Sequence, residues 1–119
     1  MKTSLSGRWG EAEAAAYLRK KGYEIIGANY HTRYGEIDLI ARKGDIIAFV
    51  EVKLRKSGAF ARALENVDAQ KQKKLTITAS LWLAANPTEM QPRFDVIEIY
   101  APNGINTSPQ SILHIENAF

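Results

Sequence analysis

Two neighbouring apolar segments of the sequence carry charged side chains where a core strand should have none. Glu36 and Asp38 lie in the first segment, and Glu51 and Lys53 end the second. Because successive side chains of a strand alternate between faces, each of these pairs shares one face of its strand. Unpaired charge is costly to bury, so the four groups must be neutralised by one another or by something they bind. A divalent metal ion is the simplest candidate.

Glu51, Val52 and Lys53 form an acid-x-lysine motif. The motif is common, so only its position in the sequence makes it a candidate for a functional site. About one such string is expected by chance in a chain of this size and charge content. This one lies at the end of the most apolar strand, with Asp38 at a similar height on the strand before it. The structural alternative is an ion pair at the sheet edge, formed by Lys53 with either Glu51 or Asp38.

Each of the two expected helices is predicted to direct one charged side chain toward the charged strands. At 100° per residue, Glu11 falls about 20° from Leu18 on the apolar stripe of the first helix. Lys71 lies on the inward stripe of the second long helix. We expect both to point toward the strand face that carries Asp38 and Glu51. The alternative for Lys71 is that its stem lies along apolar surface while the ammonium group reaches water.

Composition and charge narrow the class of protein. The chain has 119 residues, no cysteine, two isolated histidines and a net charge of +3. Disulfide frameworks and zinc sites are therefore not expected. The first 80 residues carry a net charge of +6 and the rest −3, so a basic surface surrounds the acidic centre. That layout is typical of proteins that bind a polyanion, although a mildly basic protein without such a partner shows it too.

The order of elements predicts one α/β domain over residues 1–119, arranged α-β-β-β-α-β-β. No apolar run is long enough to span a membrane and no signal sequence precedes the first helix, so we expect a cytoplasmic protein. The third strand is apolar on both faces and should be central in the sheet. The expected helices span residues 6–21 and 64–85, and the expected strands span residues 23–29, 36–42, 46–53, 94–100 and 112–115.

Cations and one aromatic ring lie in the loops and on the helix around the charged strands. Such groups suit contacts to phosphates and to unpaired bases. For any single residue, an ordinary solvated position is an equal alternative. The candidates for nucleic-acid binding are Arg33, Tyr34, Arg55, Lys56, Lys71 and Lys74.

These residues carry a resemblance to known proteins. Asp38 on one strand, Glu51 and Lys53 on the next and a preceding helix with Glu11 resemble the PD-(D/E)xK nuclease superfamily, and are most similar in order and spacing to archaeal Holliday-junction resolvases. Nearly the whole chain is similar to the bacterial YraN-like uncharacterised protein family. That similarity rests on Gly10-Glu11, Ala14, Tyr17-Leu18, Gly22-Tyr23, Asn29, Gly35-Glu36-Ile37-Asp38-Leu39-Ile40, Phe49-Val50-Glu51-Val52-Lys53, Lys71 and Phe94-Asp95-Val96. Ile37 replaces the proline of the broader superfamily, which is a backbone element and not a ligand.

The resemblance implies a restriction-endonuclease-like fold, with a mixed central sheet flanked by helices. It also implies an endonuclease that hydrolyses phosphodiester bonds of DNA, including structured or branched DNA, with Mg²⁺ or Mn²⁺. The carboxylates of Asp38 and Glu51 and the backbone carbonyl of Val52 would be metal ligands, and Lys53 would orient the attacking water. Such hard cations prefer oxygen ligands.

Two further acids receive less specific roles from the resemblance. Glu11 would complete a second metal site or hold a metal-bound water. Glu36 would be an outer ligand or the partner of a nearby arginine.

Two alternative functions stay open at the level of the sequence. The first is a nucleic-acid-binding module of the same fold without catalytic turnover. The second is a structural or adaptor protein whose charged strand ends form salt bridges. In the leading interpretation the partner is nucleic acid, with DNA favoured, no membrane is involved, and the protein acts as a monomer or as a homodimer.

Overall fold

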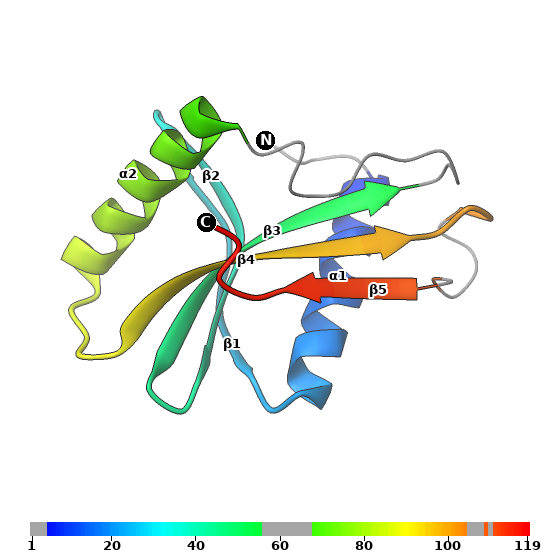
Figure 1. Ribbon diagram of the computed structural model, residues 1–119, viewed down its shortest axis with the longest axis horizontal. Helices are drawn as coiled ribbons and strands as arrows, with labels where there is room; N and C mark the ends of the chain where they lie inside the picture. The colour runs from blue at the N-terminus through cyan, green and yellow to red at the C-terminus, as the bar shows by residue number, and fades with distance from the viewer. Residues whose placement is uncertain (1–4, 56–67, 105–108, 110) are drawn as a thin grey trace.

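The computed structural model describes residues 5–55, 68–104, 109 and 111–119 of the chain. Within these residues two helices and five strands follow one another in the expected order (Figure 1). They are α1 (Leu5–Lys20), β1 (Glu24–Thr32), β2 (Gly35–Lys43), β3 (Ile46–Arg55), α2 (Ala69–Ala85), β4 (Gln91–Tyr100) and β5 (Ser111–Ile115). Neither described helix combines the length and the apolar character that crossing a membrane requires.

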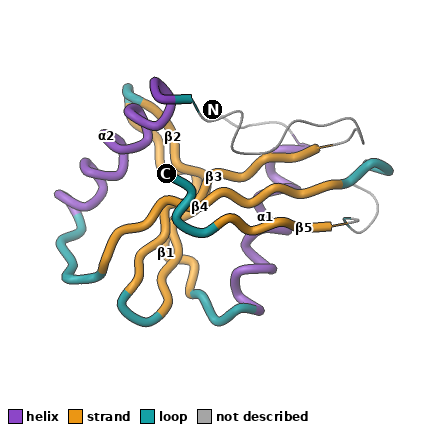
Figure 2. Tube along the Cα trace, viewed as in Figure 1, coloured by secondary structure: helices purple, strands orange, loops and turns teal. Residues whose placement is uncertain are grey.

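The five strands form one mixed sheet with the order β1-β2-β3-β4-β5 (Figure 2). The pairs β1–β2, β2–β3 and β4–β5 are antiparallel, whereas β3 and β4 run parallel. Parallel neighbours need a crossover connection, and α2 lies in that connection. The central position predicted for the third strand is confirmed.

A glycine and two backbone hydrogen bonds end α1 close to the residue that the sequence predicts. Gly22 adopts a φ of +94°, a left-handed conformation that a residue with a side chain rarely takes. The N–H of Gly22 donates to the carbonyl of Arg19 at 3.0 Å, and the N–H of Tyr23 donates to the carbonyl of Leu18 at 3.0 Å. This is the Schellman arrangement, which satisfies carbonyls at the end of a helix.

A glycine also forms the turn between β2 and β3, and polar residues mark the two ends of α2. Gly44 has a φ of +60° in the two-residue turn between β2 and β3, as the short reversal predicted by the sequence requires. Asp68 caps α2, since its carboxylate accepts a hydrogen bond from the N–H of Lys71 at 2.9 Å. The helix ends at Ala85, before Asn86 and Pro87.

Three element boundaries differ from the sequence-based prediction by three residues or more, and one of them is the start of β4, which lies at Gln91 and not at residue 94. The first strand continues to Thr32 instead of ending at Asn29, because a register shift between Ile25 and Gly27 and a φ of +53° at Asn29 bend the strand without ending it. The turn was expected over residues 30–35, but in the structure it consists of Arg33 and Tyr34 alone. The second helix was expected from residue 64, but α2 begins at Ala69, and residues 64–67 lie outside the described part of the chain.

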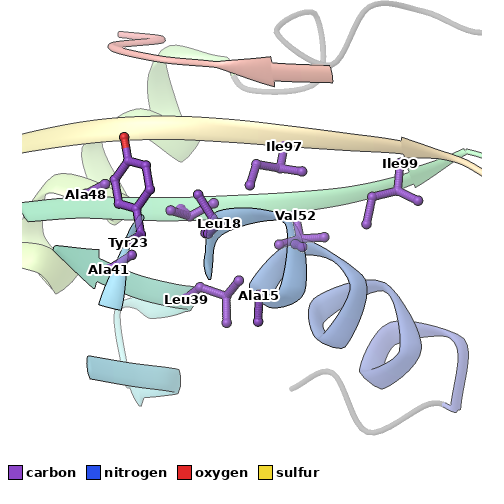
Figure 3. Close-up of a cluster of buried hydrophobic side chains, with 11 residues drawn as sticks. Ala15, Leu18, Tyr23, Leu39, Ala41, Ala48, Val52, Ile97 and Ile99 are labelled. Atoms are coloured by element: carbon purple, nitrogen blue, oxygen red, sulfur yellow. The ribbon is translucent and has the colours of Figure 1, made fainter. Parts of the chain in front are cut away.

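The core has two layers, one on each face of the sheet. Successive residues of β3 alternate between them: Val50 and Val52 pack with α1, whereas Phe49 packs with α2. Figure 3 shows the α1 layer, in which Leu18 lies among residues of the sheet. The buried members of that layer are Ala14, Ala15, Leu18, Tyr23, Leu39, Ala41, Ala48, Val50, Val52, Ile97 and Ile99. The buried members of the α2 layer are Ile37, Ile40, Ile47, Phe49, Leu75, Ala79 and Val96.

A buried charged network joins β4 to β5 and to the C-terminal segment. Asp95 is fully buried, and its carboxylate accepts two hydrogen bonds from Arg93, both at 2.8 Å, and one from the backbone N–H of Asn117 at 3.1 Å. His114 Nε2 lies 2.8 Å from the same carboxylate, and Lys21 lies 2.9 Å from His114 Nδ1. His114 thus links the segment that follows α1 to β5 and β4.

The hydrogen bonds of this network determine the charge state of Asp95. Burial acts to raise the pKa of the Asp95 carboxyl, but the hydrogen bonds from His114 and Arg93 outweigh burial and hold that pKa below its usual value. A lowered pKa in the folded state stabilises the fold at every pH above the usual aspartate pKa of about 4. This contribution is lost as the pH falls through the lowered pKa.

We predict that Asp95→Asn lowers the free energy of unfolding by about 3 kcal/mol at pH 7, because Arg93 then keeps a largely buried charge with only the half-exposed Glu116, 3.6 Å away, as its acidic partner among the described residues. The difference between wild type and variant should shrink as the pH falls below about 4. Urea unfolding followed by circular dichroism between pH 7 and pH 3 measures both effects. Glu24→Gln, which removes an exposed ion pair with Arg42, is the matched control and should change stability little. A difference that is independent of pH would contradict the assignment.

Candidate functional site

The two charged segments of the sequence meet where β2 and β3 separate. The paired residues of these strands run from Lys43 and Ile46 only as far as Leu39 and Val50. One residue beyond, Asp38 Oδ2 accepts a hydrogen bond from the backbone N–H of Val52 at 2.8 Å. A side chain thus replaces the missing strand partner at the middle of the sheet.

The backbone of Val52 faces this opening between β2 and β3. In a strand, the N–H and C=O of one residue point to the same side. The Val52 carbonyl therefore points toward the same opening as the N–H that Asp38 accepts. Asp38 is 1% exposed, so the two groups meet deep in the sheet.

Glu51 and Lys53 project from β3 toward α2. Lys53 Nζ lies 3.3 Å from Glu51 Oε1, and Lys71 Nζ of α2 lies 3.2 Å from the same oxygen. The inward direction predicted for Lys71 is confirmed by this contact, and so is the ion pair between Glu51 and Lys53 that the structural alternative required. Two ammonium groups share one carboxylate oxygen, so the trio keeps a positive charge.

The two lysines differ in how this environment changes their pKa values. Burial lowers the pKa of the Lys53 ammonium, and the adjacent Lys71 lowers it further against the opposing pull of Glu51. Burial also acts to lower the pKa of Lys71. There, however, the charge of Glu51 and the hydrogen bond to it outweigh burial and raise that pKa above its ordinary value. Lys71 is therefore the more firmly charged of the two lysines.

An open cavity of about 480 Å³ lies between the sheet and α2 at this point. Glu51 and Lys53 form part of its wall from the sheet, and Lys71 and Lys74 form part of it from the helix. The complete lining is Gly35, Glu36, Glu51, Lys53, Asp68, Gln70, Lys71, Lys74 and Leu75. The cavity is thus rich in charge, with three lysines and three acids on its wall.

Glu11 lies on α1, which covers the opposite face of the sheet from α2. It is 5% exposed, as its helix phase predicts. The adjacent Gly10 packs on β3, where an added Cβ would lie 3.9 Å from Val52 Cγ1 and 4.0 Å from Leu54 Cβ. We expected Glu11 and Lys71 to point at the same strand face, and this expectation is wrong, because α1 and α2 cover opposite faces of the sheet.

The donor groups at the separated strands are those that a hard cation prefers. Mg²⁺ in proteins is commonly held by one or two carboxylates and keeps several waters. Asp38, Glu51 and the carbonyl of Val52 provide oxygens of this kind. Among the described residues, no three acidic or histidine side chains come together as a ready-made cation site.

The residues expected to contact nucleic acid differ in their exposure and in their ionic partners. Arg33 and Tyr34 form the exposed turn between β1 and β2. Arg55 Nε lies 3.3 Å from Glu98 Oε2, so this cation has a partner within the sheet. Lys71 binds Glu51, whereas Lys74 is exposed on the cavity wall. The sixth candidate, Lys56, lies outside the described residues.

Sequence reasoning placed Glu36 near the site but missed other residues of the cavity wall. Glu36 lines the cavity, and among the described residues His31 Nδ1 lies 3.8 Å from Glu36 Oε2. Asp68 and Gln70 were not predicted to lie there. The helix-capping position of Asp68 was the available signal, because a residue that begins α2 must lie at the same end of the helix as Lys71.

Comparisons with known proteins agree with one another. The model of the family described as "Uncharacterised protein family UPF0102" matches residues 10–99. A UPF0102 protein of Syntrophomonas wolfei is 46% identical over 114 residues, which cover 95% of this chain and 96% of the relative. A UPF0102 protein of Caldanaerobacter subterraneus is 46% identical over 95% of this chain and 93% of the relative.

A relative with lower sequence identity belongs to the same family. A UPF0102 protein of Acinetobacter baumannii is 41% identical over 95% of this chain and 92% of its own length. The resemblance to YraN-like proteins found in the sequence is thereby confirmed. The chain belongs to the uncharacterised protein family UPF0102.

Proposed function

We propose that this protein is a metal-dependent nuclease with a restriction-endonuclease-like, PD-(D/E)xK fold that hydrolyses phosphodiester bonds of DNA. One observation carries the proposal. Glu51 and Lys53 project into an open cavity from the central strand, at the place where Asp38 bridges the separation of β2 and β3. Buried charge of this kind destabilises a core unless it is used or neutralised.

Asp38, Glu51 and the Val52 carbonyl would hold the metal ion, with Mg²⁺ or Mn²⁺ as the fitting cations. When bound, such an ion stabilises negative charge on a phosphoryl group and acidifies a coordinated water. Glu11 would support this site from the α1 side of the sheet, as an outer partner. Glu36 lies on the cavity wall and would act through solvent or through its neighbour His31.

The lysines have roles that follow from their positions. Lys53 is held 3.3 Å from Glu51 and faces the cavity. It would therefore hold an attacking water and offset the negative charge that develops on the phosphate. Lys71 binds the same oxygen of Glu51 from α2 and so fixes the orientation of that carboxylate. Lys74, exposed on the same wall, would bind a phosphate of the DNA backbone.

We predict that the protein cleaves DNA when Mg²⁺ or Mn²⁺ is added, and that Asp38→Asn, Glu51→Gln and Lys53→Met each reduce the rate at least about 100-fold. Asn at position 38 keeps an oxygen that accepts the Val52 N–H, so the strand contact is preserved while the charge is lost. Supercoiled, single-stranded, flap and four-way-junction DNA serve as substrates. Glu24→Gln, at an exposed pair far along β1, is the control and should retain the wild-type rate.

The same assay separates this function from its alternatives. Salt-sensitive DNA binding without cleavage under any metal condition would favour a non-catalytic binding module. Absence of both binding and cleavage would favour a structural protein. Cleavage that survives in the Asp38, Glu51 and Lys53 variants would mean that the chemistry occurs elsewhere.

We predict that Lys71→Gln tightens Mn²⁺ binding by about tenfold. The Lys71 ammonium lies 3.2 Å from Glu51 Oε1 and repels a cation bound to that carboxylate, by roughly 1 to 2 kcal/mol at water-like screening. Isothermal titration calorimetry with Mn²⁺ alone measures the change. Lys73→Gln is the matched control, because Lys73 is exposed on the same helix but does not line the cavity. Unchanged or weaker Mn²⁺ binding in Lys71→Gln would argue against metal at Glu51.

We predict that Lys74→Ala weakens DNA binding equally for all sequences and lowers the slope of log K against log salt concentration by about 1. The reason is that one phosphate contact, with its released counter-ion, is lost. Fluorescence anisotropy at several salt concentrations provides the slope. Lys73→Ala removes the same charge one residue away, outside the cavity wall, and should leave the slope nearly unchanged. Equal effects of both variants would indicate only a general loss of charge.

A further inference from the structure

The turn between β1 and β2 presents an aromatic ring and a guanidinium group as one unit. Tyr34 is 40% exposed. The Arg33 guanidinium lies over its ring, with Cζ 4.8 Å from the ring centroid, and Arg33 Nη2 donates to the Tyr34 hydroxyl at 2.6 Å. The guanidinium thus supports the ring and adds a positive charge beside it.

The turn that carries this pair is held firmly in place. Thr32 Oγ1 accepts a hydrogen bond from the Tyr34 N–H at 3.1 Å and donates to the carbonyl of Gly35 at 3.3 Å. The same hydroxyl lies 3.5 Å from Thr78 Oγ1 of α2. The turn is therefore tied both to itself and to the helix, and little conformational entropy would be lost if Tyr34 made a contact.

Gly35 allows the turn to approach α2 closely. A Cβ added at Gly35 would lie 3.2 Å from Thr78 Oγ1 and 3.7 Å from Lys74 Cβ. Gly35 and Lys74 both belong to the wall of the cavity that contains Glu51. In Figure 1 the β1–β2 turn lies beside the first turns of α2, at the top of the view. Tyr34 thus stands at the rim of the proposed active site.

We infer that Tyr34, supported by Arg33, is a stacking platform that binds an unpaired base of the nucleic acid entering the cavity, which makes DNA with a single-stranded portion the preferred substrate class. The inference rests on the proposed function for the identity of the ligand as nucleic acid. A base inside a duplex has both faces covered by its neighbours. Only an unpaired base offers a free face to an aromatic side chain, and stacking of this kind tolerates any sequence.

The surroundings of Tyr34 favour a base over a protein partner. Besides Tyr34, the exposed large hydrophobic side chains among the described residues are Leu81 on α2 and Leu113 on β5. They belong to different elements, and a protein interface is normally built around a buried apolar centre. A single ring beside Arg33 and near Lys74 combines aromatic stacking with phosphate-binding charge, as single-stranded nucleic acid requires.

The strand between Tyr34 and Asp38 sets a distance for this contact. Four residues of extended chain span about 13 Å. At the spacing of stacked nucleotides this corresponds to on the order of four nucleotides. The unpaired base should therefore lie about four nucleotides from the phosphate held near Asp38 and Glu51.

Binding measured without cleavage tests the inference. The probes are a fluorescein-labelled DNA with a single-stranded flap and a blunt duplex of equal length, both in EDTA so that no metal-dependent cleavage occurs. Tyr34→Ala should weaken flap binding roughly tenfold, a typical loss for one stacked base, and leave duplex binding unchanged. Tyr34→Phe keeps the ring and should bind within about twofold of wild type. Leu113→Ala, on the distant β5, is the control for loss of an exposed apolar side chain.

A second readout locates the stacked base. 2-Aminopurine placed at successive flap positions should be quenched on binding at one position, about four nucleotides from the cleaved bond, and Tyr34→Ala should abolish this quenching. Equal losses for flap and duplex, or no loss in Tyr34→Ala, would overturn the inference, and so would a failure to bind any DNA.

The outcomes also separate this inference from the proposed function. Tyr34-dependent flap binding by a protein that never cleaves DNA would support the platform and contradict the nuclease. Cleavage by a protein in which Tyr34→Ala behaves as wild type would support the nuclease and contradict the platform.

Discussion

The hydrogen bond from the Val52 N–H to Asp38 is the contact on which the arrangement of the site depends. The N–H of a central strand lies where water cannot reach it, and leaving such a group without an acceptor costs about 1–3 kcal/mol. The Asp38 carboxylate accepts this N–H just beyond the last paired residues of β2 and β3. β2 separates from β3 here, and Glu51 and Lys53, which project from β3 toward α2, line an open cavity.

The sheet and α2 bring charged groups together at this separation. The sheet supplies Asp38, Glu51 and Lys53, and α2 supplies Lys71, whereas Glu11 is buried on α1 at the opposite face of the sheet. The position of α2 is fixed by apolar packing of its inner face on the sheet. Lys71 therefore reaches Glu51 because of packing elsewhere on the same helix, and a change that shifts α2 would also change the charge balance at Glu51.

The sequence permits prediction of those features that arise from local patterns. Apolar runs and the glycines at turns gave the order of elements and the central place of β3, and helix phase gave the inward direction of Lys71 and the burial of Glu11. Phase shows that a side chain faces the sheet but not which face the helix covers, so the placement of Glu11 and Lys71 on one side was wrong. The contact between Asp95 and His114 joins residues 19 positions apart and depends on strand register, which no local pattern determines.

Two of the buried acids, Asp95 and Glu51, differ in the exposure of their partners. Asp95 is surrounded by donors that are themselves covered, since the His114 side chain is 1% exposed and that of Arg93 is 17% exposed. Exchange of these partners for a ligand would require the sheet to open. The carboxylate of Glu51 is bound instead by two lysines at an open cavity, and the Lys71 side chain is 35% exposed. An ammonium group that can move into water can give way to a cation, so Glu51 and not Asp95 has the properties of a binding carboxylate.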